Sequence, residues 1–369
     1  MHHSFAARVA GLACAMLTLS AVPAAADARY GDVQEALSEL AGSELVVGAI
    51  GAVYVDGERI DQGSAGTRLL TGGGKIPADS RYRVGSQTKQ MVATVVLQLI
   101  GENKLGVDDK LSEVLPETAE RDLVELADQI TVRQLLAHTS GIPNYLGGTG
   151  TPSPFDFTTY YRPADLVKLS RALEREQEPG QAFSYSNTNY ILLGMIIERL
   201  TGRTLADELD RRIFGPLDMS RSYLPTKPPE GIRGPHGHGY HPDEQGRLRD
   251  VDRLNASVLW AAGGVVSTTR DISAFQSAFA RGDLLSAEMR ELRRSILGGG
   301  SPGADRPCAG SGLEISGATG GAPGFHAITF TTTDGRVQFA VSATLTNPDN
   351  AAIRELTKTA AEAVLCPAK

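Results

Sequence analysis

The division of the chain into strand-like and helix-like segments is the feature that most restricts its fold. Apolar stretches with strand character lie near both ends, at residues 45–55, 325–332 and 337–345. Helical periodicity dominates between residues 105 and 253. We therefore predict an α/β (α+β) fold: an antiparallel sheet built from N- and C-terminal strands, flanked by helices, with a mostly helical part inserted between them.

The chain length fits one large domain or two. It has 369 residues, and 41% of them are hydrophobic, which is enough for a substantial core. We expect one domain over residues 27–369. Its α/β part would comprise residues 27–104 and 254–369, and its mostly helical part residues 105–253.

The first 26 residues have the composition of an export signal. One charge, Arg8, precedes an apolar run over residues 9–22 and three small residues at 24–26, a pattern that suits cleavage before Asp27. The run is shorter than the roughly 18 residues that a transmembrane helix requires. We therefore predict a signal peptide over residues 1–26, a secreted or periplasmic location, and no membrane span in the mature chain.

Charge and cysteine content restrict the partners and the redox chemistry. The chain has 36 basic and 43 acidic residues without a basic stripe, which argues against a nucleic-acid partner. Of its 3 cysteines, Cys14 would leave with the signal peptide. Cys308 and Cys366 would then either form a disulfide, as export permits, or remain two free thiols.

A serine and a lysine stand three residues apart where a strongly apolar helical pattern begins. Ser86 and Lys89 would face the same side of the first turn. A serine hydroxyl needs a base to become nucleophilic, and a desolvated lysine shifts toward the neutral amine that can act as one. The helix N-terminus would add backbone N–H groups near a developing oxyanion. The alternative is that Ser86 is only a helix cap.

Two further clusters carry groups that could complete such a site. Tyr185 and Asn187 are two residues apart on a loop, so a phenol and an amide can point into one cleft. The alternative is an aromatic packed under the loop and an asparagine that caps the next helix. Thr319, Gly320 and Gly321 precede the last hairpin, where glycines allow a ligand to approach the backbone and the Gly321 N–H could be an oxyanion donor. The alternative there is a plain bulge or turn.

The order of these three clusters resembles that of the serine β-lactamase and penicillin-binding protein superfamily. The likeness is greatest to class C β-lactamases and soluble, secreted D-Ala-D-Ala carboxypeptidases, and it spans nearly the whole mature chain. It rests on four stretches of sequence: Tyr82-Arg83-Val84-Gly85-Ser86-Gln87-Thr88-Lys89, His138-Thr139-Ser140-Gly141-Ile142-Pro143, Tyr185-Ser186-Asn187-Thr188-Asn189-Tyr190 and residues 260–268.

This resemblance implies a role for each matching residue. Ser86 would be the acylated nucleophile, Lys89 its proton partner, and Tyr185 the general base or acid. The resemblance also implies a Cys308–Cys366 disulfide, no cofactor and no metal. The substrate would be bound by Asn187, Trp260, Thr319 and Gly320, and the oxyanion by the backbone N–H groups of Ser86 and Gly321.

Two departures from the family pattern bear on the substrate. The third motif normally begins with Lys or His, but here it begins with Ala318, which removes a group that binds a substrate carboxylate. The segment between Leu297 and Cys308 is short and rich in glycine and proline. The carboxypeptidases it resembles have a strand and a carboxylate-binding arginine there, a role that Arg306 could take.

Two other patterns are weaker indications of chemistry. Residues 299–303 match G-x-S-x-G, but Pro302 and the glycines favour a loop over the strand–turn–helix that a nucleophile elbow needs. His236, His238 and His241 lie within six residues of one another. For them we expect a structural loop of the same family rather than a metal site.

We therefore expect a monomeric, exported serine hydrolase that forms an acyl-enzyme. The favoured reaction is D-Ala-D-Ala carboxypeptidase-like cleavage of a peptidoglycan stem peptide. An esterase or amidase acting on another small acyl substrate is the main alternative, because a neutral Ala318 suits an uncharged acyl donor. A class C-like β-lactamase and a weakly active penicillin-binding sensor are the other two.

Overall fold

The computed structural model describes residues 1–2, 30–228, 230–298, 307–308, 312–346 and 350–367. Residues 3–26 of the predicted signal peptide, the G-x-S-x-G segment at 299–303 and Arg306 lie outside these ranges. Within them, no helix is both long and apolar enough to cross a bilayer.

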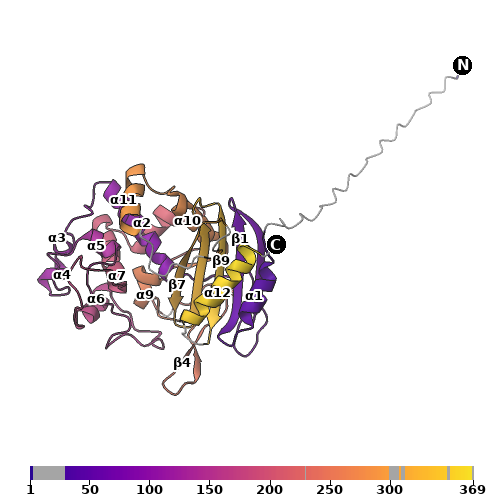
Figure 1. The fold of residues 1–369 in the computed structure, drawn as a ribbon, viewed down its shortest axis with the longest axis horizontal. Helices are drawn as coiled ribbons and strands as arrows, with labels where there is room; N and C mark the ends of the chain where they lie inside the picture. The colour runs from indigo at the N-terminus through magenta and orange to yellow at the C-terminus, as the bar shows by residue number, and fades with distance from the viewer. Residues whose placement is uncertain (3–29, 229, 299–306, 309–311, 347–349, 368–369) are drawn as a thin grey trace.

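A five-stranded antiparallel sheet joins the two ends of the chain (Figure 1), which confirms the predicted fold class. The strand order is β2-β1-β9-β8-β7, so that β7 is an edge strand. N-terminal β1 pairs along its length with C-terminal β9, with Ala49 opposite Ala343. The strands are β1 (Val46–Val55), β2 (Glu58–Gly66), β7 (Ile315–Ala322), β8 (Phe325–Thr332) and β9 (Val337–Leu345).

Helices cover both faces of this sheet. Val53 and Val341 belong to the core that the sheet forms with the helices at the chain ends, whereas Ile50 and Ala340 belong to a second core on the opposite face. The alternating residues of β9 predict a half-buried strand, but nearly all of it is buried because a helix packs on its second face. The flanking helices are α1 (Val33–Ala41) and α12 (Asn350–Leu365) on one face and α10 (Thr269–Arg281) on the other.

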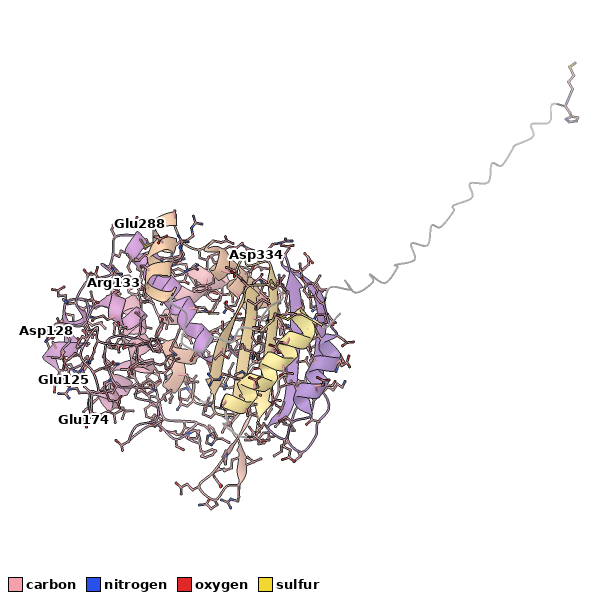
Figure 2. The ribbon with its side chains drawn as sticks, in the orientation of Figure 1. Glu125, Asp128, Arg133, Glu174, Glu288 and Asp334 are labelled. Atoms are coloured by element: carbon pink, nitrogen blue, oxygen red, sulfur yellow. A yellow bond between two sulfur atoms is a disulfide. The ribbon has the colours of Figure 1, made fainter. Side chains whose placement is uncertain are left out.

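The rest of the chain forms a helical half beside the sheet (Figure 1). Its central helices α2 and α7 are apolar almost all round and are buried, as helices inside a large core should be. The charged side chains of Glu125, Asp128, Arg133 and Glu174 lie on the outer side of this half, away from the sheet (Figure 2). The helices are α2 (Thr88–Gly101), α3 (Leu111–Val114), α4 (Glu117–Glu120), α5 (Val132–Leu136), α6 (Pro163–Arg171), α7 (Asn187–Thr201), α8 (Leu205–Leu209), a π-helical turn (Asp210–Phe214), α9 (Ala256–Gly263) and α11 (Ala287–Leu297).

Two short strand pairs lie outside the main sheet. β3 (Tyr82–Arg83) pairs with β6 (Val266–Ser267) and leads into the 3-10 turn η1 (Gly85–Gln87) that precedes α2. β4 (Tyr240–Pro242) and β5 (Leu248–Asp250) form a hairpin that projects from the body of the molecule (Figure 1).

A disulfide ties the C-terminal helix to the segment before β7. Cys308 and Cys366 are bonded, with their Cα atoms 5.9 Å apart, and both belong to the core between α12 and the sheet. The alternative of two free thiols is therefore wrong in this structure.

Candidate active site

Ser86 lies at the meeting point of the two halves, in the turn η1 rather than in α2 itself. The preceding Gly85 has a φ of +55°, a conformation that L side chains rarely adopt. A Cβ on Gly85 would lie 2.6 Å from the Gly321 nitrogen, and a Cβ on Gly320 would lie 2.7 Å from the Ser86 nitrogen. The turn and the edge strand β7 can therefore approach this closely only because both carry glycine.

Lys89 is a buried amine that faces Ser86. Its side chain enters the core on the first turn of α2, and only 5% of the residue is exposed. Nζ lies 3.2 Å from Ser86 Oγ, 2.7 Å from Asn187 Oδ1 and 2.5 Å from the Ala262 carbonyl oxygen. The amine thus faces three hydrogen-bond acceptors, which belong to η1, α7 and α9 respectively.

Burial lowers the pKa of Lys89 to about 7, so much of the amine is neutral at physiological pH. A neutral amine keeps two N–H groups and one lone pair. Its two hydrogens can be donated to Asn187 and Ala262, the two nearer acceptors, which leaves the lone pair for the Ser86 hydroxyl proton. The contacts thus satisfy both the charged and the neutral amine.

Tyr185 approaches Ser86 from the other side. Its hydroxyl lies 2.8 Å from Ser86 Oγ, and its ring lies 4.9 Å from Lys89 Nζ. Loss of hydration raises the pKa of Tyr185, although the hydrogen bond with Ser86 acts in the opposite direction. The phenol is therefore protonated at neutral pH and can donate as well as accept. The residue as a whole is 42% exposed, so part of it is open to a ligand.

Asn187 begins α7, and its amide is oriented by a residue that the sequence does not single out. Asn144 Oδ1 accepts hydrogen bonds from both the backbone N and the Nδ2 of Asn187, each at 3.1 Å. Because Asn144 holds the amide nitrogen, the amide oxygen of Asn187 is directed at Lys89. The available signal was the position of Asn144 directly after the His138–Pro143 stretch that carries part of the family resemblance.

His138 is a second residue to which the sequence gives no role. Its ring stacks on Tyr185 with centroids 4.6 Å apart, and its Nδ1 accepts a hydrogen bond from the Ser186 backbone N–H at 3.2 Å. Burial, together with the charge of Lys89, lowers the pKa of His138 to about 3. The His138 ring is therefore neutral where it stacks on the Tyr185 ring.

The remaining predicted residues lie on β7 and α9. Gly320 is buried and Thr319 exposed, and Ala318 precedes them on the edge strand. Trp260 is only 6% exposed, and a Cβ on Gly194 of α7 would lie 2.8 Å from its ring. The indole is thus packed in the core between α7 and α9, and its predicted place in the cleft wall stays a prediction.

Comparison with known proteins identifies the family of almost the whole chain. Residues 33–363 match the family model described as Beta-lactamase. The chain belongs to the β-lactamase family. The predicted family is thereby confirmed.

Individual members of the β-lactamase family that are similar to this chain have several activities. Penicillin-binding protein 4 of Amycolatopsis lactamdurans is 33% identical over 54% of this chain and 50% of its own length. A D-aminopeptidase of Cereibacter sphaeroides is 27% identical over 80% of this chain and 56% of its own length. The chain thus spans about half the length of these relatives.

A solved structure of this family extends the likeness to full length. A D-stereospecific amidohydrolase from Streptomyces sp. is 29% identical, with a TM-score of 0.75 that covers 91% of this chain and 98% of the other. This β-lactamase-family chain therefore shares the fold of that amidohydrolase, although the two sequences differ at most positions.

Proposed function

We propose that this protein hydrolyses amide bonds through an acyl-enzyme. We propose further that its acyl donor is a D-amino acid residue and that its leaving group carries no carboxylate. The contacts among Ser86, Lys89 and Tyr185 are the observation that carries the reaction type. The disulfide supports an exported protein, because disulfides persist in oxidising compartments.

The acylation step uses the three groups in order. Ser86 Oγ attacks the substrate carbonyl carbon while its proton passes to the Lys89 amine. The backbone N–H groups of Ser86 and Gly321 stabilise the oxyanion as it develops. The C–N bond then breaks, the departing nitrogen takes a proton through the Tyr185 hydroxyl, and the Lys89 amine returns to its neutral form. The amine product leaves, and Ser86 carries the acyl group as an ester.

Deacylation reverses these roles with water as the nucleophile. Water attacks the ester carbonyl and gives its proton to the Tyr185–Lys89 pair, and Ser86 Oγ takes a proton as it departs. The acid product then dissociates. No separate acidic residue is needed in this scheme, which agrees with the lack of a class A type acidic motif in the sequence.

Ala318 and the structural likeness together support the substrate class. A methyl group stands where the family usually carries a cation or histidine, so a substrate carboxylate would lose a charged hydrogen bond, at a cost of roughly 1.5–3 kcal/mol. An amide or amine terminus loses nothing by that change. The similar structure that covers nearly the whole chain is that of a D-stereospecific amidohydrolase.

D-Ala-D-Ala carboxypeptidase activity, the reaction that the sequence favours, is the second candidate. It is supported by the 33% identity with a penicillin-binding protein over half the chain. Both candidates share a D-configured acyl donor and differ in whether the leaving group carries a carboxylate.

Turnover of matched substrates tests the proposal. We expect the protein to release p-nitroaniline from D-alanine p-nitroanilide at least tenfold faster than from the L-enantiomer, and to release little D-alanine from a tripeptide ending in D-Ala-D-Ala. The opposite preference would reject the first candidate in favour of the second. Intact-protein mass after a short incubation should show an acyl adduct that is lost in Ser86→Ala and kept in Ser316→Ala, an exposed position on β7.

A further inference from the structure

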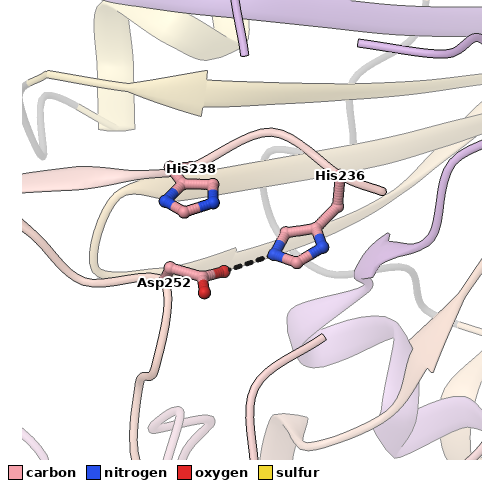
Figure 3. A group of neighbouring side chains, drawn as sticks. All are labelled: His236, His238 and Asp252. Atoms are coloured by element: carbon pink, nitrogen blue, oxygen red, sulfur yellow. Dashed lines mark hydrogen bonds and ion pairs between the residues drawn. The ribbon is translucent and has the colours of Figure 1, made fainter. Parts of the chain in front are cut away.

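Three ligand-type side chains meet at the base of the projecting β4–β5 hairpin, outside the site described above. His236, His238 and Asp252 each place one potential ligand atom within 4.8 Å of the others (Figure 3). The two histidines precede β4, and the aspartate follows β5. The sequence favours a structural loop here, but on this geometry we propose that the three residues form a binding site for a divalent transition metal, and that Zn²⁺ is the ion that suits them best.

The first support comes from the outer contacts of the two rings. His236 Nδ1 lies 2.6 Å from the Gly234 carbonyl oxygen, and His238 Nδ1 lies 2.7 Å from Asp250 Oδ2. Both partners are acceptors, so each Nδ1 carries the proton and each Nε2 keeps its lone pair when the ring is neutral. An imidazole held in this way by a carbonyl or carboxylate is the usual arrangement behind a metal-bound histidine.

The second support is that His236 faces an acceptor at both ring nitrogens. Its Nε2 lies 2.6 Å from Asp252 Oδ1, while its Nδ1 already donates to Gly234. A neutral imidazole has only one N–H group and cannot donate a hydrogen bond at both of its nitrogens. A metal ion between Nε2 and the carboxylate oxygen would satisfy both contacts.

The geometry requires small movements for a metal to bind. Bonds of about 2.0–2.2 Å to tetrahedral Zn²⁺ place ligand atoms roughly 3.4 Å apart. The His236–Asp252 contact must therefore open, and the widest separation must close. The two rings lie nearly parallel, at 8°, with centroids 5.3 Å apart, so one of them must turn to point at a shared ion. His238 is the more exposed ring, and its partner Asp250 is itself exposed enough to follow it.

The charged groups near the cluster indicate whether a bound ion would have a structural or a catalytic role. The backbone oxygen of Asp252 accepts a hydrogen bond at 2.7 Å from Arg83 of β3, the strand that leads into the Ser86 turn. The guanidinium opposes a second cation, whereas Asp250 and Asp252 attract one. A bound ion would clip the two ends of the hairpin together beside β3. We assign it a structural role rather than a part in the hydrolysis.

Metal binding to the full-length protein tests this proposal directly. After treatment with a chelator, the protein is dialysed against Zn²⁺, and the bound metal and the midpoint of thermal unfolding are measured. We expect one Zn²⁺ per chain and a higher unfolding temperature for the wild type. His238→Gln should weaken binding at least tenfold. The matched control is His241→Gln, because the His241 ring lies against Phe155 and outside the cluster.

Two further measurements keep the result decisive. If His238→Gln folds poorly, Asp250→Asn removes only the outer acceptor and should still weaken Zn²⁺ binding about tenfold. Hydrolysis of a p-nitrophenyl ester reports folding independently of the metal. Absence of Zn²⁺ binding, or equal binding by wild type and His238→Gln, would overturn the proposal and identify the His236–Asp252 contact as a simple ion pair.

Discussion

At the scale of single residues, the charge on the Lys89 amine decides whether Ser86 can react. The amine loses most of its hydration, and its neutral form is matched by two acceptors and one hydroxyl. A lysine of ordinary pKa would be almost fully protonated at neutral pH and could accept no proton. The proposed role of Lys89 as a base therefore requires that its side chain stay buried.

The pH dependence of acylation follows from this burial. Because burial lowers the pKa of Lys89 to about 7, kcat/KM should fall about tenfold per pH unit below that value and level off above it. Initial rates between pH 5 and 9 on an N-acylated D-amino acid ester, whose charge does not change in this range, give the profile. A flat profile over this range would contradict the role of Lys89. Lys89→Arg should be inactive at every pH, because a guanidinium stays protonated.

Asn144 offers a test of how the amine is positioned. Asn144→Ala removes the acceptor that fixes the Asn187 amide, and we expect kcat to fall about 10- to 100-fold, the equivalent of roughly 1–3 kcal/mol, with little change in KM. Asn144→Asp keeps an acceptor but adds a negative charge behind Asn187. It should move the rising limb of the pH profile to higher pH. A purely structural role would lower activity in both variants without moving that limb.

The sequence predicts the residues that touch the reacting atoms better than those that hold them. The structure brings Ser86, Lys89, Tyr185 and Asn187 together, and the stretches that flank them carry the family resemblance. The support from Asn144 depends on a contact 43 residues away in the chain, with no local pattern that marks it. Sequence periodicity and motif spacing do not predict tertiary contacts of this kind.

At the scale of elements, the approach of edge strand β7 to the turn η1 controls the shape of the site. Gly320→Ala would place a methyl group against the Ser86 nitrogen and force the strand away from the turn. We expect a loss of at least 100-fold in kcat/KM, because the two oxyanion donors would separate. Ser316→Ala, on the same strand but exposed, should retain wild-type rates. Near-normal turnover by Gly320→Ala would show that β7 does not shape the oxyanion site.

The predictability of the elements depends on how clearly one face is apolar. β8 and β9 fall at their predicted residues, because Asp-Gly marks the turn between them. The glycine-rich sequence of residues 63–74 predicts a loop, and this prediction is partly wrong, because β2 continues to Gly66 through pairing with β1. The helix α9 has no specific prediction: it is apolar all round and is interrupted at Trp260, whose φ is +30°. Neither feature produces a helical period.

At the scale of the whole molecule, the disulfide holds the last helix to the sheet. The Cys308–Cys366 bond closes a segment of 58 residues, and restriction of the unfolded chain by such a loop corresponds to about 4 kcal/mol. We expect the Cys308→Ser, Cys366→Ser double variant to unfold several degrees lower in calorimetry while its kcat/KM at 25 °C stays within about threefold. A reducing agent should lower the wild-type transition by the same amount and leave that of the double variant unchanged. An unchanged transition in the variant would assign stability to the core alone.

The partners of the Lys89 amine have a consequence for how activity appears during renaturation. Asn187 stands 98 residues from Lys89 along the chain, and Ala262 stands 173 residues away. A nascent or partly assembled chain therefore presents a hydrated, cationic lysine beside an inert serine. Ser86 becomes nucleophilic only after the most distant segments have packed around Lys89. Hydrolytic activity therefore measures the completion of folding, and a partly folded chain has none.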